Sequence, residues 1–284
     1  MLEGHALRSV HVEGDPAPGF VAFLDGTQES RVLFYYDGLP VVYGTVAAVV
    51  RVRVNRRLVT WRRGPLVERR LYAPCAYLPA DACDVLGVGG VEVVDTTASA
   101  REGDPVSRHP AALLERALAL VQHDRERAEK ALAEAWCGLE RGPIFIDGSV
   151  QESEVVATAP CAVGVVKSHR TLYVDGEALR TVLALKRGRR SSVFRVATSH
   201  RTPVASWYLR LRDHAGRDPM WGLVRVEAAD LSGRGERLED LTRRADQVSR
   251  WVLAEASPLA LPDGRWDKMV YGIRDCEEFL RAVC

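Results

Sequence analysis

Two short apolar runs in this chain are each followed by aspartate, glycine and a hydroxyl residue. The first run is Val21–Leu24, which precedes Asp25-Gly26-Thr27, and the second is Ile144–Ile146, which precedes Asp147-Gly148-Ser149. Apolar runs with β-branched and aromatic members are typical of strands buried on both faces. Glycine lets the backbone turn sharply or approach a ligand closely. The pattern predicts two carboxylates at the ends of two core strands.

What these carboxylates do depends on whether the two strands are neighbours. Adjacent strands lie ~5 Å apart, so ionised carboxylates at their ends repel each other strongly. A divalent cation bound by Asp25 and Asp147 relieves this repulsion. The alternative is that the two sequences are Asx-type turns that close unrelated strands.

The first run is expected to open a group of three antiparallel strands. The other two are Arg31–Asp37 and Val41–Val54, joined by a turn. An Arg-rich excursion follows over residues 55–108, with arginines around Trp61 and Tyr72. It is either a nucleic-acid surface, with arginine for phosphate and an aromatic for base stacking, or a solvated segment.

Apolar residues at helical spacing predict one long helix over His109–Leu139. The segment after it is expected to mix strands and helices. The predicted strands are Ala162–Val166, Arg170–Val174, Ser192–Ala197, Trp207–Leu211 and Leu223–Val226, and the predicted helices are Ala178–Leu185, Arg237–Glu255 and Cys276–Val283. Residues 1–18 are rich in Gly and Pro and are expected to form a poorly fixed arm. The prediction is therefore one domain over 19–284 behind this arm.

Composition narrows the class of protein. The chain has 284 residues, of which 47% are hydrophobic, so it is long and apolar enough for a sizeable core. The net charge of +1 points to no partner, although arginine far outnumbers lysine, which suits bidentate phosphate contacts. Six cysteines without C-x-x-C spacing predict reduced thiols. No secretory signal or membrane-spanning run is present, so we expect a cytoplasmic protein.

The element order is strand with Asp, antiparallel strands, excursion, helix, strand with Asp, then a mixed tail. This is the order of the RNase H-like fold, a mixed α/β sheet flanked by helices, in which the two Asp-bearing strands lie side by side. A carboxylate on the connecting helix then reaches the same point. Glu129 is the first choice, with Glu126, Glu134 and Glu115 as other candidates. Several carboxylates around one point suit two Mg²⁺ or Mn²⁺ ions. Such ions activate water and stabilise the leaving oxygen of a phosphodiester.

With these motifs in their order, residues 20–282 resemble the NurA nuclease family. The resemblance rests on the two Asp-Gly segments, the helix that carries Glu129, and several later segments. These are Val163–Lys167, Ser206–Arg210, Gly222–Glu227 with its Arg-x-Glu, and Ser257–Pro262. It implies a metal-dependent nuclease acting on DNA ends in repair or antiphage defence, a homodimer, and a hexameric HerA-type ATPase as partner.

The resemblance also suggests site residues. Asp25 and Asp147 match the family's metal-binding aspartates, and Glu129 matches its helix carboxylate. The family's last-helix histidine is absent, and we take Asp267 as its replacement; the preceding family tyrosine is missing, with Ala256 and Ser257 in its place. Lys167 is a candidate for contacting the scissile phosphate. The candidate DNA-binding residues are Arg62, Arg63, Lys186, Arg187, Arg189 and Arg190. The arm of residues 1–18 is the candidate docking element for the ATPase, since a segment of this kind can order on a partner.

Three other classes of protein share features with this sequence. A HAD phosphatase needs an aspartate two residues before Asp25, where Phe23 stands, so its nucleophile is missing. A sugar-kinase or actin-type ATPase needs a Gly-rich phosphate loop, for which Gly87–Gly90 is a weak candidate. A non-catalytic RNase H-like module that binds DNA or an ATPase stays open, and it predicts that loss of Asp25 changes nothing.

Overall fold

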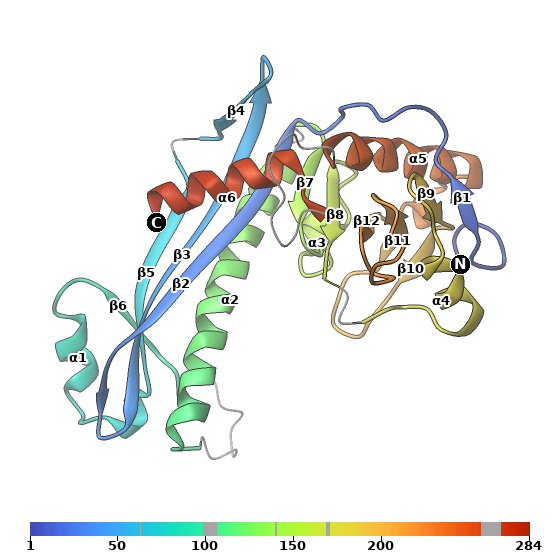
Figure 1. Cartoon of the computed structure of the whole chain (residues 1–284). Helices are drawn as coiled ribbons and strands as arrows, with labels where there is room; N and C mark the ends of the chain where they lie inside the picture. Colours follow the sequence, from blue (N-terminus) through green and yellow to red (C-terminus); the bar gives the residue numbers. More distant parts are fainter. Residues whose placement is uncertain (63, 99–106, 140, 169–170, 257–267) are drawn as a thin grey trace. The chain divides into compact units, whose positions relative to one another are not determined.

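The computed structural model describes residues 1–62, 64–98, 107–139, 141–168, 171–256 and 268–284. The chain divides into two compact units (Figure 1). Unit 1 comprises residues 1–25, 50–61 and 132–276, and unit 2 comprises residues 26–49, 62–131 and 277–284. Strands β2 (Ala22–Tyr36) and β3 (Leu39–Val54) and helix α2 (Pro110–Cys137) contribute residues to both. No helix among the described residues is long and apolar enough to cross a membrane.

Unit 1 is built on a mixed sheet. Its strands follow the order β1-β9-β11-β12-β8-β7-β2, with β10 paired to β11. These strands are β1 (Ser9–His11), β7 (Ile144–Asp147), β8 (Ala162–Val166), β9 (Arg189–Ser191), β10 (Phe194–Val196), β11 (Val204–Arg210) and β12 (Leu223–Ala229). The pairs β2/β7 and β7/β8 are parallel, whereas β8/β12, β12/β11 and β1/β9 are antiparallel. Every residue of β11 and β12 is buried, which explains their long apolar runs.

The helices of unit 1 are α3 (Glu154–Ala157), α4 (Gly176–Leu183), α5 (Leu238–Glu255) and the start of α6 (Tyr271–Val283), with the short 3₁₀ helix η2 at Ser232–Arg234. The first turn of α6 packs on β2, because a Cβ on Gly272 would overlap the Phe23 ring and the Cys276 thiol donates to the Phe23 carbonyl. Burial raises the pKa of the Cys276 thiol, and the negative charge of Asp25 adds to this shift. Helix α6 therefore begins beside the strand that carries Asp25.

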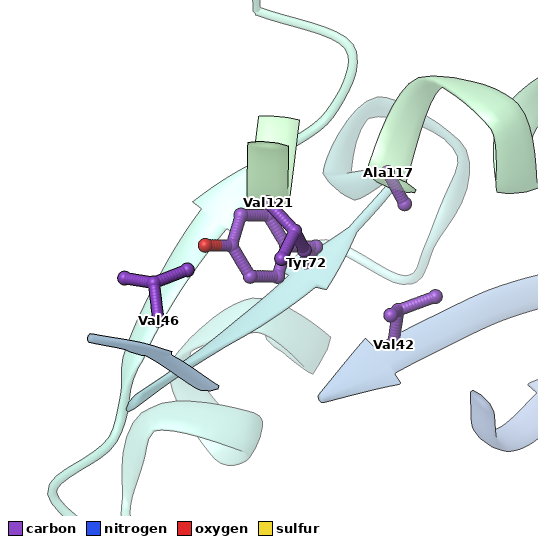
Figure 2. Packing of buried hydrophobic residues seen from close by; sticks show 5 residues of the cluster. All are labelled: Val42, Val46, Tyr72, Ala117 and Val121. Atoms are coloured by element: carbon purple, nitrogen blue, oxygen red, sulfur yellow. The ribbon is translucent and has the colours of Figure 1, made fainter. Parts of the chain in front are cut away.

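Unit 2 packs helix α2 against β3, β5 (Leu66–Ala73) and β6 (Glu92–Asp95). The buried cluster Val42, Val46, Tyr72, Ala117 and Val121 joins the sheet to the helix (Figure 2). The helix comes close at Gly44, where a Cβ would lie 2.8 Å from the Val121 side chain. The buried Tyr72 hydroxyl donates to Asp124 of α2 at 2.6 Å. Tyr72 is thus a core residue, and it is not the exposed aromatic that the nucleic-acid alternative would need.

The predicted mixed α/β class is confirmed, as are several helices. The helix expected over His109–Leu139 is α2, that expected over Arg237–Glu255 is α5, and that expected over Ala178–Leu185 is α4, at Gly176–Leu183. The helix expected over Cys276–Val283 begins five residues earlier, at Tyr271. Of the predicted strand Arg170–Val174, residue 170 lies outside the described residues, and 171–174 form no strand.

The start of the chain departs from the prediction of three antiparallel strands. One strand, β2, runs unbroken from Ala22 through Asp25 to Tyr36. Its two-residue turn at Asp37 and Gly38 has φ of 45° and 80°, the left-handed pair typical of a type I′ hairpin turn. Glycine at position 26 therefore does not end the first strand.

The N-terminal segment is ordered, contrary to the predicted poorly fixed arm. Strand β1 pairs with β9, with Val10 opposite Arg190. Glu3 is only 2% exposed and receives hydrogen bonds from Arg190 and the Val193 amide. Residues 1–18 belong to unit 1, because long-range pairing and a buried ion pair fix them there.

The Arg-rich excursion is also structured. It contains β4 (Arg57–Thr60), β5, the 3₁₀ helix η1 (Cys75–Tyr77), α1 (Ala82–Gly87) and β6. Cys75 and Cys83 form a disulfide between η1 and α1, so the prediction of reduced thiols is wrong for this pair. Among the described residues the other four cysteines, at positions 137, 161, 276 and 284, are free thiols.

Candidate active site

The two Asp-Gly segments lie on adjacent strands of unit 1. In the parallel pair β2/β7, Phe23 is opposite Phe145 and Leu24 is opposite Ile146, so Asp25 and Asp147 each follow at the next position. Adjacent strands are ~4.8 Å apart, which brings two carboxylates to the same level of the sheet. Asp25 is 8% exposed and Asp147 is half-buried. The expected adjacency of the two strands is confirmed, and the reading as turns on unrelated strands is wrong.

A lysine from the next strand neutralises one of these carboxylates. Lys167 directly follows β8, and its Nζ lies 2.8 Å from Asp147 Oδ2. The backbone carbonyl of Lys167 in turn accepts a hydrogen bond from Lys268 Nζ at 2.9 Å. Asp267 lies outside the described residues, but its neighbour Lys268 is held at the end of β8.

The loop after Asp147 is fixed by a buried carboxylate that the sequence analysis did not select. Glu227 of β12 is fully buried and accepts hydrogen bonds from Ser149 Oγ (2.8 Å), the Val150 amide (3.1 Å) and Gln151 Nε2 (2.8 Å). Arg225 Nη2 donates to the same carboxylate at 2.6 Å. All four groups donate to this one carboxylate, so it holds both the loop and Arg225. The available signal was a charged Arg-x-Glu inside an otherwise apolar strand.

Two glycines make this loop geometry possible. Gly148 has φ of 135°, a left-handed conformation that favours glycine. Gly164 of β8 is directly opposite Glu227, and a Cβ there would lie 2.7 Å from the Gly148 carbonyl oxygen. The loop therefore packs directly on the backbone of β8 at Gly164, where no side chain intervenes, and reaches Glu227. This contact fixes the backbone that follows Asp147.

We expect Glu227→Gln to destabilise the protein by about 2–3 kcal/mol, because the amide nitrogen cannot accept from buried donors, and each one left unpaired costs ~1–3 kcal/mol. Urea unfolding measures the loss, and hydrogen exchange at the Val150 amide reports whether the loop opens. Glu255→Gln is the matched control, since Glu255 is a buried acid paired with the half-exposed Arg53 away from this loop. Equal losses in the two variants with unchanged Val150 protection would contradict this role.

In unit 2, Glu129 of α2 lies against the residue that follows Asp25 in the chain. A Cβ on Gly26 would overlap the Glu129 carboxylate, so any larger residue at position 26 would displace it. Glu129 is half-buried and forms an ion pair with Arg125. The alternative Glu126 accepts from Gln122 on the same helix at 2.8 Å and lies 3.6 Å from Arg125, the arginine that also pairs with Glu129.

The other two helix candidates have separate positions. Glu134, in unit 1, accepts a hydrogen bond from Ser153 Oγ, and this serine also caps α3. Glu115 is exposed on α2. Of the four candidates, Glu129 alone is placed by the structure against Gly26.

The donor set can be tested against a divalent cation. Asp25 and Asp147 offer the oxygen ligands that Mg²⁺ and Mn²⁺ prefer. The described residues contain no group of three or more His, Cys, Asp or Glu side chains placed to hold a metal ion. The aspartate pair therefore fits a hard cation in its chemistry. Among the described residues no third carboxylate is grouped with it, and Asp267 lies outside those residues.

Comparison with known proteins bears on the fold. No protein-family model and no curated protein matches the chain. Among solved structures it is similar to the crystal structure of the NurA nuclease from Sulfolobus solfataricus, with a TM-score of 0.55 and 10% identity, over 96% of this chain and 81% of that one. The chain has a NurA-like fold. The identity is low, so the likeness concerns the fold and assigns no residue.

The residues predicted to bind DNA differ from one another in exposure. Lys186, Arg187 and Arg62 are exposed, and Arg63 lies outside the described residues. Arg189 is half-buried and donates to Ser9. Arg190 is fully buried between Glu3 and Asp246, so its predicted contact with DNA is wrong.

Proposed function

We propose that this protein is a divalent-metal-dependent deoxyribonuclease that hydrolyses phosphodiester bonds at DNA ends. One observation carries the proposal: Asp25 and Asp147 follow paired positions of two adjacent parallel strands. A NurA-like fold supports it, since the similar solved structure is that of a nuclease. Two buried or half-buried aspartates at one level of a sheet are costly unless a cation or a lysine balances them.

Each residue has a stated role in this proposal. Asp25 and Asp147 hold the metal, Glu129 and Asp267 complete its ligands, and Lys167 contacts the scissile phosphate. Support for Glu129 is its packing against Gly26, whereas Asp267 is proposed from its position in the sequence alone. Bound Mn²⁺ or Mg²⁺, as two ions, would activate the attacking water and stabilise the leaving oxygen. The chain's own contribution is to orient these oxygens, with Glu227 fixing the loop beyond Asp147.

The assembly is proposed by analogy with the family resemblance. It consists of a homodimer bound to a hexameric HerA-type ATPase that delivers DNA, with no membrane involved. Residues 1–18 are ordered in the structure, and this changes how they are proposed to dock on the ATPase. The segment is folded against unit 1, so it would present a preformed surface to the ATPase and would not need to order on binding.

A single assay tests the activity. The purified protein is incubated with end-labelled linear duplex, single-stranded DNA and closed circular DNA, in Mn²⁺, Mg²⁺ or EDTA. We expect cleavage of linear substrates in Mn²⁺ or Mg²⁺, and none in EDTA. Full activity in EDTA would exclude the metal mechanism. No activity on any DNA under any of these conditions would favour the non-catalytic module.

A further inference from the structure

The Arg-rich excursion starts within an acid-free stretch of sequence. Between Asp37 and Glu68 the chain has no Asp or Glu, yet it carries six arginines, at positions 51, 53, 56, 57, 62 and 63. Elsewhere in the structure, several arginines pair with carboxylates, among them Arg70 with Glu92 and Arg244 with Glu236. This stretch cannot supply such partners locally, so each arginine is either neutralised by a distant acid or left available to a polyanion.

Four of these arginines, at positions 51, 53, 56 and 57, lie in unit 1 on the hairpin of β3 and β4. Arg51 is opposite Thr60, and Val54 is opposite Arg57. The turn residues Asn55 and Arg56 have φ of 47° and 65°, the left-handed pair of a type I′ turn. The two strands and their tight turn give the hairpin tip a defined shape.

The two arginines at the base of the hairpin are structural. Arg51 pairs with Asp275 at 2.6 Å and also donates to Thr60 and to the Leu58 carbonyl. Arg53 pairs with Glu255 at 2.8 Å. Both are at least partly buried, and their charges are used within the protein.

The two arginines at the tip are different. Arg56 and Arg57 are exposed, and within the described part of the chain neither has an ion pair or a side-chain hydrogen bond. Val54 and Val59 beside them are 47% and 44% exposed. The tip thus carries two unopposed guanidinium groups next to apolar side chains, which suits the phosphates and sugars of a nucleic-acid backbone.

We propose that the β3–β4 tip, residues 54–57, binds the DNA backbone at a distance from the cleaved bond. The proposal rests on the proposed nuclease function for its substrate. The Arg53 amide donates to the Val21 carbonyl at 2.8 Å, so the tip extends past the start of β2, away from Asp25. At ~3.3 Å per residue, Arg56 is about 20 Å along the strands from the level of Asp25. With a rise of ~3.4 Å per nucleotide, this corresponds to about six nucleotides.

The test uses Arg56→Gly/Arg57→Gln, because Asn-Gly is a favoured type I′ pair and keeps the turn intact. Affinity for a fluorescent 30-mer duplex is measured in EDTA over a range of salt. Two lost phosphate contacts should reduce the slope of log K against log salt by about 1.8, so the loss of affinity should be about twelvefold larger at 0.05 M salt than at 0.2 M salt. In Mn²⁺, hydrolysis of bis(p-nitrophenyl) phosphate should match the wild type, because this substrate is too small to reach the tip.

The control Arg237→Gln/Arg243→Gln removes two exposed charges on or beside α5 that are paired with Asp240. It should leave the slope nearly unchanged. An unchanged slope in a folded tip variant, or an equal loss in the control, would overturn the proposal. A wild-type protein that binds DNA through the tip but cleaves nothing would instead defeat the nuclease function and leave the tip assignment standing.

Discussion

We expect Asp25→Asn and Asp147→Asn each to abolish the proposed metal-dependent DNA cleavage, lowering the rate by at least about 10³-fold, while the protein remains folded. Loss of one ligand from a metal site removes several kcal/mol of transition-state stabilisation, and ~1.4 kcal/mol corresponds to tenfold in rate. Asparagine has nearly the same shape as aspartate. The packing just beyond the paired segments of β2 and β7 is therefore preserved.

The two substitutions should differ in stability. Asp25→Asn removes a buried carboxylate beside Asp147, which relieves repulsion and should leave stability equal or higher. Asp147→Asn removes the partner of Lys167 in a pair whose side chains are about 20% exposed, 21% for Lys167 and 20% for Asp147. A pair of this exposure contributes ~0–1 kcal/mol, so the second variant should be slightly less stable.

The measurement combines end-labelled DNA cleavage in Mn²⁺ with urea unfolding. Asp37→Asn is a matched control, because it alters another Asp-Gly pair that forms the β2–β3 turn, where Asn-Gly is equally favourable. Wild-type cleavage by either Asp25→Asn or Asp147→Asn would refute the nuclease function. Cleavage lost in the Asp37→Asn control would show that the assay reports folding.

The sequence was sufficient to predict the adjacency of the two aspartates. Short apolar runs followed by Asp-Gly reflect local rules of burial and backbone freedom, and the helix between them allows a parallel pairing of β2 and β7. The same rules did not predict the length of β2. Past Gln28 this strand is mostly exposed, so its hydrophobic pattern did not reveal that it continues to Tyr36.

Residues fixed by long-range contacts were the ones that sequence reasoning missed. Glu227 contacts a loop 76 to 78 positions away, and Glu3 contacts Arg190 187 positions away. The Arg-x-Glu inside an apolar strand was the one local signal for Glu227. Nothing local marks Glu3 or Arg190, because a charged residue near a terminus or in a basic run is usually solvated. Glu126 and Glu129 could not be separated from spacing alone, since the overlap with Gly26 depends on how α2 packs on β2.

The ion pair that holds the N-terminal segment leads to the last prediction: Arg190→Met destabilises the protein by about 3–5 kcal/mol, the usual cost of breaking a buried pair from one side. Arg190 is fully buried, with Nη1 2.6 Å from Glu3 and Nε 2.6 Å from Asp246. Methionine preserves much of the apolar volume but leaves both carboxylates without their partner. Arg189→Met is the control, because Arg189 is half-buried and donates only to Ser9.

The pH dependence provides a signature that packing loss alone does not produce. Burial opposes ionisation of Glu3, but its hydrogen bonds with Arg190 hold its pKa below the usual value. The wild type therefore has this stabilisation above the unfolded pKa of ~4.3 and loses it as pH falls through the lower folded pKa. Without Arg190, burial is expected to raise the pKa of the Glu3 carboxyl, so the variant should regain stability as pH falls from 7 to 5. Urea unfolding at both pH values measures this, and a variant whose deficit is the same at pH 5 and pH 7 would argue that Glu3 and Asp246 do not depend on Arg190.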